Sequence, residues 1–107
     1  MEAATVTGAA MLKFFVLRTH RGQVIDLAKP GAAILAGVGG TFEILRSGDG
    51  TIRVSIDGVQ CTTEAGVNYW PTFLSDGPHA VLVELIRDEA VADSKPFTVE
   101  VKPCPNR

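Results

Sequence analysis

The chain of 107 residues is poor in cysteine and in aromatic residues. Its two cysteines, Cys61 and Cys104, are too few for the disulfide framework of a small secreted scaffold, and they lack the spacing of a metal knuckle. Either both thiols are free, or they pair and close a loop that would contribute about 4 kcal/mol in a chain-entropy treatment. The sequence leaves both possibilities open.

A strong charge of one sign is also missing. Ten Lys and Arg are scattered among twelve Asp and Glu, for a formal net charge of −2, and no basic run occurs. The chain therefore has little electrostatic basis for binding a phosphate backbone or an anionic membrane. We expect no nucleic-acid partner.

Long hydrophobic runs are absent from the sequence as well. No stretch approaches the roughly 20 apolar residues that span a bilayer, because Lys13, Arg18 and Arg21 interrupt the first apolar run and glycines interrupt the next. Met1 is followed by Glu2 and a mild Ala/Thr/Gly stretch, so we expect neither membrane insertion nor a signal peptide in the given chain. A cytoplasmic product, a phage component released by lysis and a piece of a longer exported protein all remain possible sources.

What the sequence does contain is one domain of short apolar segments. A chain of this length buries roughly 60–65 % of the surface that its unfolded form exposes, which is enough for one continuous core. We expect a flexible N-terminal arm or linker at residues 1–10, a folded domain at 11–103 and a C-terminal tail at 104–107.

The predicted strands share alternation of apolar and polar residues, or a short apolar run, between turn signals. They cover residues 11–18, 23–27, 32–35, 41–46, 51–56, 59–62, 79–87 and 97–102. We expect residues 41–46 and 51–56 to form a hairpin, and residues 88–96 to form a loop. In the strand at 79–87, we expect Val81, Val83 and Leu85 to point inward.

Strands at this spacing, without a helical crossover, predict an all-β fold in which two antiparallel sheets pack as a sandwich. A small barrel is the alternative.

Three segments carry a resemblance to a known family. TIRVSIDGV at 51–59, FLSDGPHAVLVELIRDEAV at 73–91 and FTVEV at 97–101 are similar to bacterial immunoglobulin-like (Ig-like or fibronectin-III-like) modules of surface and phage proteins. In that family an Asp-Gly turn ends a strand, a segment L-x-D-G-x-H-x-V-x-V introduces the penultimate strand, and F-T-V closes the domain. The matching residues are Asp57, Gly58, Leu74, Asp76, Gly77, His79, Val81, Val83, Phe97, Thr98 and Val99.

The resemblance extends from Phe42 to Val101 and implies an Ig-like sandwich of about seven strands with a non-catalytic role. It also implies an extracellular, cell-surface or virion location. Because the matching residues are turn and core positions, it does not identify a partner.

Few residues suggest chemistry. His79, next to a turn, is either a ligand or pH-sensitive contact, or a cap that hydrogen-bonds the turn. His20 lies in a turn without an adjacent carboxylate and is expected to be solvated. Asp88, Glu89 and Asp93 form either a weak Ca²⁺ site or a solvated acidic loop. No nucleophile motif or phosphate loop occurs, so we expect neither an enzyme nor a cofactor.

The remaining candidate site is the aromatic segment of Asn68, Tyr69, Trp70 and Phe73. Aromatic faces beside an amide suit a sugar ring or a protein contact. Alternatively, Tyr69 and Trp70 plug the end of the sandwich where the chain crosses between the sheets.

The function expected from these features is a non-catalytic binding, adhesion or spacer module of a bacterial or phage surface assembly, in contact with protein or carbohydrate. One alternative is a structural subunit or decoration protein with homotypic contacts seeded by Leu45, Leu82 and Ile86. Another is an accessory domain of a carbohydrate-active enzyme.

Overall fold

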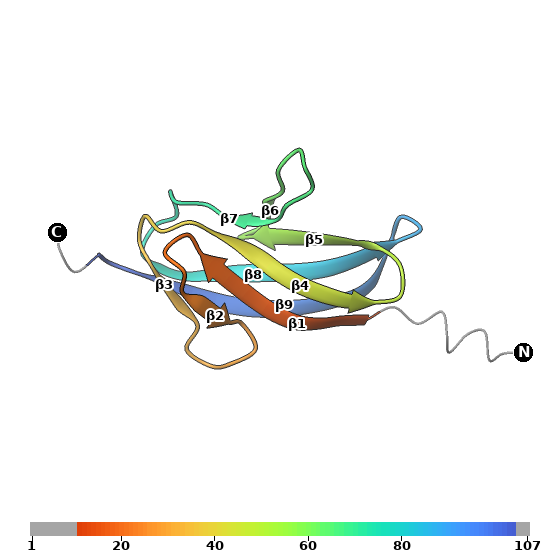
Figure 1. Cartoon of the computed structure of the whole chain (residues 1–107), viewed down its shortest axis with the longest axis horizontal. Helices are drawn as coiled ribbons and strands as arrows, with labels where there is room; N and C mark the ends of the chain where they lie inside the picture. The colour runs from red at the N-terminus through yellow and green to blue at the C-terminus, as the bar shows by residue number, and fades with distance from the viewer. Residues whose placement is uncertain (1–10, 105–107) are drawn as a thin grey trace, which may run out of the picture.

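The computed structural model describes residues 11–104, which form strands, turns and irregular segments. The arm predicted at 1–10 and the last three residues of the predicted tail lie outside the described residues. Two sheets pack face to face (Figure 1). The first contains, in spatial order, β2 (Val24–Asp26), β1 (Met11–Thr19), β4 (Gly40–Ser47) and β7 (Tyr69–Trp70). The second contains β3 (Ala33–Leu35), β9 (Ala90–Lys102), β8 (Gly77–Arg87), β5 (Thr51–Ile56) and β6 (Val59–Gln60).

The prediction of an all-β protein with two packed sheets is confirmed. The sheets are mostly antiparallel, but β3 runs parallel to β9, in a register that pairs Ala33 with Glu100. The N-terminal region therefore supplies strands to both sheets: β1 and β2 to the first, and β3 to the second.

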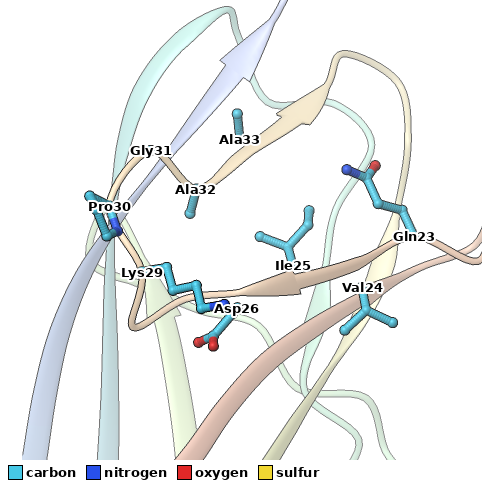
Figure 2. A pocket seen from close by; sticks show the side chains of 9 residues that line it. All are labelled: Gln23, Val24, Ile25, Asp26, Lys29, Pro30, Gly31, Ala32 and Ala33. Carbon is cyan, nitrogen blue, oxygen red and sulfur yellow. The ribbon is translucent and has the colours of Figure 1, made fainter.

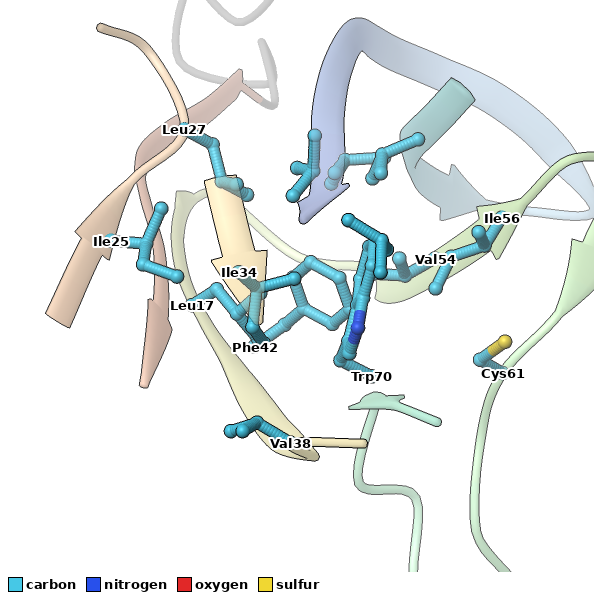
Figure 3. Packing of buried hydrophobic residues seen from close by; sticks show 14 of the residues in the cluster. Leu17, Ile25, Leu27, Ile34, Val38, Phe42, Val54, Ile56, Cys61 and Trp70 are labelled. Carbon is cyan, nitrogen blue, oxygen red and sulfur yellow. The ribbon is translucent and has the colours of Figure 1, made fainter. Parts of the chain in front are cut away.

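Alternation places the core between the sheets. Val81, Val83 and Leu85 in β8 are buried as predicted, and Val54 and Ile56 of the neighbouring β5 face the same way. The buried cluster draws side chains from both sheets (Figure 3). Its labelled members are Leu17, Ile25, Leu27, Ile34, Val38, Phe42, Val54, Ile56, Cys61 and Trp70.

The prediction that residues 41–46 and 51–56 form a hairpin is wrong. β4 pairs with β1 and β7, whereas β5 pairs with β8 and β6, so residues 47–50 carry the chain from one sheet to the other. The crossing is tight, because a Cβ on Gly50, which has φ 142°, would lie 2.7 Å from Leu85 Cδ1. Alternation showed that each strand has one buried face, but it could not show that the two faces oppose each other.

The prediction of a loop at residues 88–96 is also wrong. Asp88 and Glu89 alone form the turn, with φ of 52° and 64°, and Arg87 pairs directly with Ala90 at the start of β9. Positive φ at both turn residues produces the tight turn that matches strand twist. Most of β9 before Phe97 is exposed, and for this reason its sequence lacks the apolar alternation that marks a half-buried strand.

Candidate functional site

The segment after β6 seals one side of the sandwich. Cys61 N donates to Val54 O at 2.9 Å on the edge of the second sheet, and Tyr69 N donates to Cys61 O at 3.2 Å. β7 then pairs with β4 of the first sheet, with Gly40 opposite Trp70. The segment thus lies between the edge strands of both sheets.

Asn68 links the two sheets directly. Its Nδ2 donates to Ile52 O in β5 at 3.2 Å, while its carbonyl accepts from Phe42 N in β4 at 3.0 Å. Its Oδ1 accepts from Thr62 Oγ1 at 2.8 Å. Because both ends of the amide are engaged within the fold, the Asn68 side chain acts as a tie between the sheets.

The aromatic rings of the segment point in different directions. Trp70 is only 2 % exposed and lies beside Phe42 in the core (Figure 3). Its ring centroid lies 6.4 Å from that of Phe42 and 6.2 Å from that of His79. Tyr69 is half-buried, and Phe73 is 81 % exposed. The four residues of the candidate site therefore do not form one platform. Trp70 fills the core, and only Phe73 is fully presented to a partner.

His79 is a buried polar side chain with both ring nitrogens in hydrogen-bond contact. It is 7 % exposed at the start of β8, its Nδ1 lies 2.5 Å from Asp57 Oδ2, and its Nε2 lies 2.6 Å from Ser75 O. Asp57 Oδ1 also accepts from Ala80 N at 3.0 Å. The site thus joins the β5–β6 turn, the loop before β8 and β8 itself. Asp57 is the partner that the sequence argument missed, and the Asp-Gly turn was the available signal.

Hydrogen bonding in this site raises the pKa of His79 and lowers that of Asp57. The Ser75 carbonyl and the Asp57 carboxylate raise the pKa of His79 above its usual value, against the opposing effect of burial. The bonds from His79 and from Ala80 N lower the pKa of Asp57. Since a carboxylate and a carbonyl can only accept, both ring nitrogens must donate, and the geometry fits an imidazolium. With both nitrogens engaged, the ring acts as a charged brace for the turn.

The cysteines considered for a disulfide are both free thiols. Cys61 is buried in the core cluster, and this burial raises the pKa of its thiol, which disfavours the reactive thiolate. Cys104 lies partly exposed after the end of β9.

The acidic residues considered for Ca²⁺ are separated by the fold. Asp88 and Glu89 form the β8–β9 turn, whereas Asp93 lies within β9, where its Oδ2 accepts from Leu12 N at 2.8 Å and its Oδ1 accepts from Ser94 N at 2.9 Å. Asp93 thus connects β9 to β1 of the other sheet. Within residues 11–104, no three His, Cys, Asp or Glu side chains are placed to hold a metal ion.

A hollow that the sequence argument did not anticipate lies between β2 and β3 (Figure 2). It has a volume of about 390 Å³, and a smaller hollow of about 190 Å³ shares Gln23 and Ala33 with it. The larger is lined by residues 23–26 and 29–33, with Ile25 and Ala32 pointing into the space (Figure 2). In the sequence, the hollow is indicated only by the break in the strands at Lys29-Pro30-Gly31.

Comparison with protein-family models, with curated proteins and with solved structures finds no match to this chain. In the described part of the chain, no helix has the length and apolar character needed to cross a bilayer.

Proposed function

We propose that the chain is a non-catalytic, immunoglobulin-like spacer module of a bacterial or phage surface assembly. The order of the strands supports this assignment. β5, β8 and β9 are neighbours in one sheet, as strands C, F and G are in an immunoglobulin domain, and β1, β4 and β7 are neighbours in the other, as strands A, B and E are. On this assignment, β2, β3 and β6 are additional short edge strands.

The observation that carries the spacer role is the path of the chain through the sandwich. β1 begins at one end of the long axis, at Met11, and β9 ends at the opposite end, at Lys102 (Figure 1). The 13 residues of β9 alone span about 40 Å at the usual rise per strand residue. In a module with this path, the parts attached to its two ends are separated by about the length of its strands.

The direction of the strands also suits a spacer under load. β1 and β9 run along the long axis (Figure 1), and hydrogen bonds in antiparallel ladders lie across the strands. Tension applied through Met11 and Lys102 therefore shears whole ladders at once instead of opening them one bond at a time. Resistance to such tension would keep the spacing constant.

Single-molecule force spectroscopy tests the spacer role. In the first geometry, the full chain is pulled through its two ends. In the second, a Cys104→Ser variant is pulled through the substitutions Asp49→Cys and Asp88→Cys, which lie in two turns at the same end of the sandwich (Figure 1). We expect the end-to-end pull to need the higher force, because the second geometry peels strands apart. Equal or lower force along the axis would contradict the proposal.

A structural subunit with homotypic contacts is the second candidate, and Phe14 supports it. Phe14 is 56 % exposed at a bulge in β1 and has φ 63°, a conformation that non-glycine residues adopt at a cost. Met11 and Leu45, both exposed, belong to the same β1–β4 pair. Backbone strain that presents an aromatic ring to solvent is typical of functional positions. Leu82 and Ile86 belong to the other sheet, so the set predicted to seed one interface is divided between two sheets.

Phe14→Gly tests this candidate, because glycine tolerates the positive φ while removing the ring. We expect the variant to be at least as stable as the wild type and to associate less in sedimentation experiments. Val59→Ala, which removes an exposed side chain from β6, is the control. Unchanged association in Phe14→Gly would exclude this surface as the contact.

A further inference from the structure

β2 and β3 are edge strands on the same side of the sandwich, one in each sheet. Leu27 N donates to Phe15 O at 2.9 Å and Thr19 N donates to Gln23 O at 2.8 Å, so residues 23, 25 and 27 direct their backbone groups toward β1. By alternation, Val24 directs its N–H and C=O outward.

The backbone groups of β3 alternate in the same way. Glu100 N donates to Ala32 O at 3.0 Å and Ala36 N donates to Lys102 O at 2.8 Å, so residues 32, 34 and 36 face β9. Ala33 therefore directs its N–H and C=O away from β9, beside the hollow that it lines. Two open strand edges thus flank one hollow, which is the arrangement that accepts an added strand.

Two other edges of the described chain are protected, whereas β6, on the opposite side of the sandwich, leaves Gln60 facing outward. Along β9, Pro96 has no N–H and Ser94 N donates to Asp93 Oδ1. On the opposite side of the sandwich, the segment around Asn68 covers the edges of β4 and β5. Among residues 11–104, no protection of these kinds occurs at Val24 or Ala33, and β6 is a single two-residue edge, whereas β2 and β3 are two open edges beside one hollow. The side formed by β2 and β3 is therefore the one best suited to pairing with another chain.

We propose that residues 3–9 of a neighbouring copy add as a strand to this edge and join copies head to tail. The segment AATVTGA at 3–9 contains no proline and no charge. Its central residues Thr5, Val6 and Thr7 are β-branched, which favours an extended strand, and the Ala and Gly residues around them are small enough for a hollow with Gly31, Ala32 and Ala33 in its wall.

The direction of the chain favours a neighbouring copy over the same copy. Met11 pairs with Ser47, the last residue of β4, so the β1–β4 ladder ends there. The hollow begins beside Val16, about 17 Å back along β1, so the arm would have to reverse to reach its own copy. A second copy placed in line meets the arm without a reversal, and the contact is of the heterologous kind that extends into filaments. The inference does not rest on the immunoglobulin-like assignment.

Two full-length variants test the contact from its two sides. Thr5→Pro with Thr7→Pro prevents the arm from forming a strand, whereas Ala33→Pro removes an outward N–H without removing a bond to β9. Gln60→Pro is the matched control, because Cys61 bonds toward β5 and Gln60 therefore faces the outer edge on the other side of the same sheet. We expect the wild type and the control to show masses above the monomer that rise with concentration in sedimentation equilibrium, and each edge or arm variant to associate about tenfold more weakly.

Mixing the two variants gives the decisive result. The arm variant keeps a competent edge and Ala33→Pro keeps a competent arm, so the mixture should form one-to-one heterodimers and nothing larger. A monomeric wild type, variants that associate like the wild type, or a mixture without heterodimers would each overturn the proposal. If Ala33→Pro does not fold, hydrogen exchange of the Val24 and Ala33 amides in the wild type replaces it. Protection that rises with protein concentration supports the contact, and protection independent of concentration overturns it.

Discussion

His79 acquires its role from Asp57, a residue that lies 22 positions earlier in the chain. The turn cap predicted from sequence fits the bond to Ser75, whereas the bond to Asp57 depends on the pairing of β5 with β8. The combination places the His79 ring 6.2 Å from the ring of buried Trp70, with the two planes at 88°. A buried imidazolium makes the stability of the fold depend on pH.

The pKa of His79 is raised in the folded state, so its contribution to stability is complete below its unfolded pKa of about 6.5 and is lost as the pH rises through the folded pKa. The pKa of Asp57 is lowered, so its contribution is present above about pH 3.9 and is lost as the pH falls through its folded pKa. We expect maximal stability between about pH 4 and 6.5, measured by urea unfolding with Trp70 fluorescence.

His79→Gln is the control for this dependence. We expect it to destabilise the fold by about 1–2 kcal/mol near pH 6 and to flatten the decline above that pH. The value is modest because Asp57 is half-exposed and solvent screens the pair. A decline parallel to that of the wild type would show that another group titrates.

Asn68 provides a second test at the residue scale. Asn68→Ala removes the bonds to Ile52 O and Thr62 Oγ1, and we expect a loss of about 2 kcal/mol in the free energy of unfolding. Thr63→Ala is the matched control from the same segment, because the Thr63 hydroxyl accepts from Val67 N four residues away and so makes a local bond instead of one between the sheets. It should cost about 0.5 kcal/mol. Equal losses would mean that the bond between the sheets adds nothing to stability.

At the scale of the element, two turns of the same length differ in sequence. Asp57–Gly58 joins β5 to β6 with φ of 52° and 84°, and Asp88–Glu89 joins β8 to β9 with φ of 52° and 64°. The first has glycine where the left-handed conformation needs it, and the second does not. The Asp-Gly pair is therefore recognisable in the sequence as a tight turn, whereas Asp88 and Glu89 look like part of a loop over residues 88–96.

Glu89→Gly should relieve strain and stabilise the protein by about 1 kcal/mol. Gly58→Ala should destabilise it by a similar amount, and through conformation alone, since a Cβ at Gly58 would meet no atom within 4 Å. Thermal and urea unfolding measure both changes. If Glu89→Gly lowered stability, contacts of the Glu89 side chain would have to outweigh its backbone strain.

At the scale of the whole molecule, the sheets are joined on both sides. Asn68 ties β4 to β5 on one side, and Asp93 ties β9 to β1 on the other. Between these ties lies a core to which both sheets contribute, including the fully buried Leu17 and Val83. Such a structure has no sheet that could unfold by itself without exposing the core of the other.

We therefore expect one cooperative transition. Leu17→Ala in the first sheet and Val83→Ala in the second should each destabilise the protein, Leu17→Ala by about 2–5 kcal/mol, and shift the unfolding curves from circular dichroism and from Trp70 fluorescence together. Separation of the two curves in either variant would show that the sheets unfold independently.

The sequence by itself determined the strands with apolar alternation and the residues of their buried faces, because the period of two is a local property of each segment. Val81, Val83 and Leu85 were predicted inward on this basis and are buried. Tertiary structure decided the rest. Sheet membership, as for β4 and β5, depends on partners distant in the chain, and so does the position of Trp70 in the core. The pairing of His79 with Asp57 and the hollow between β2 and β3 arise only where separate segments meet, so no single segment encodes them.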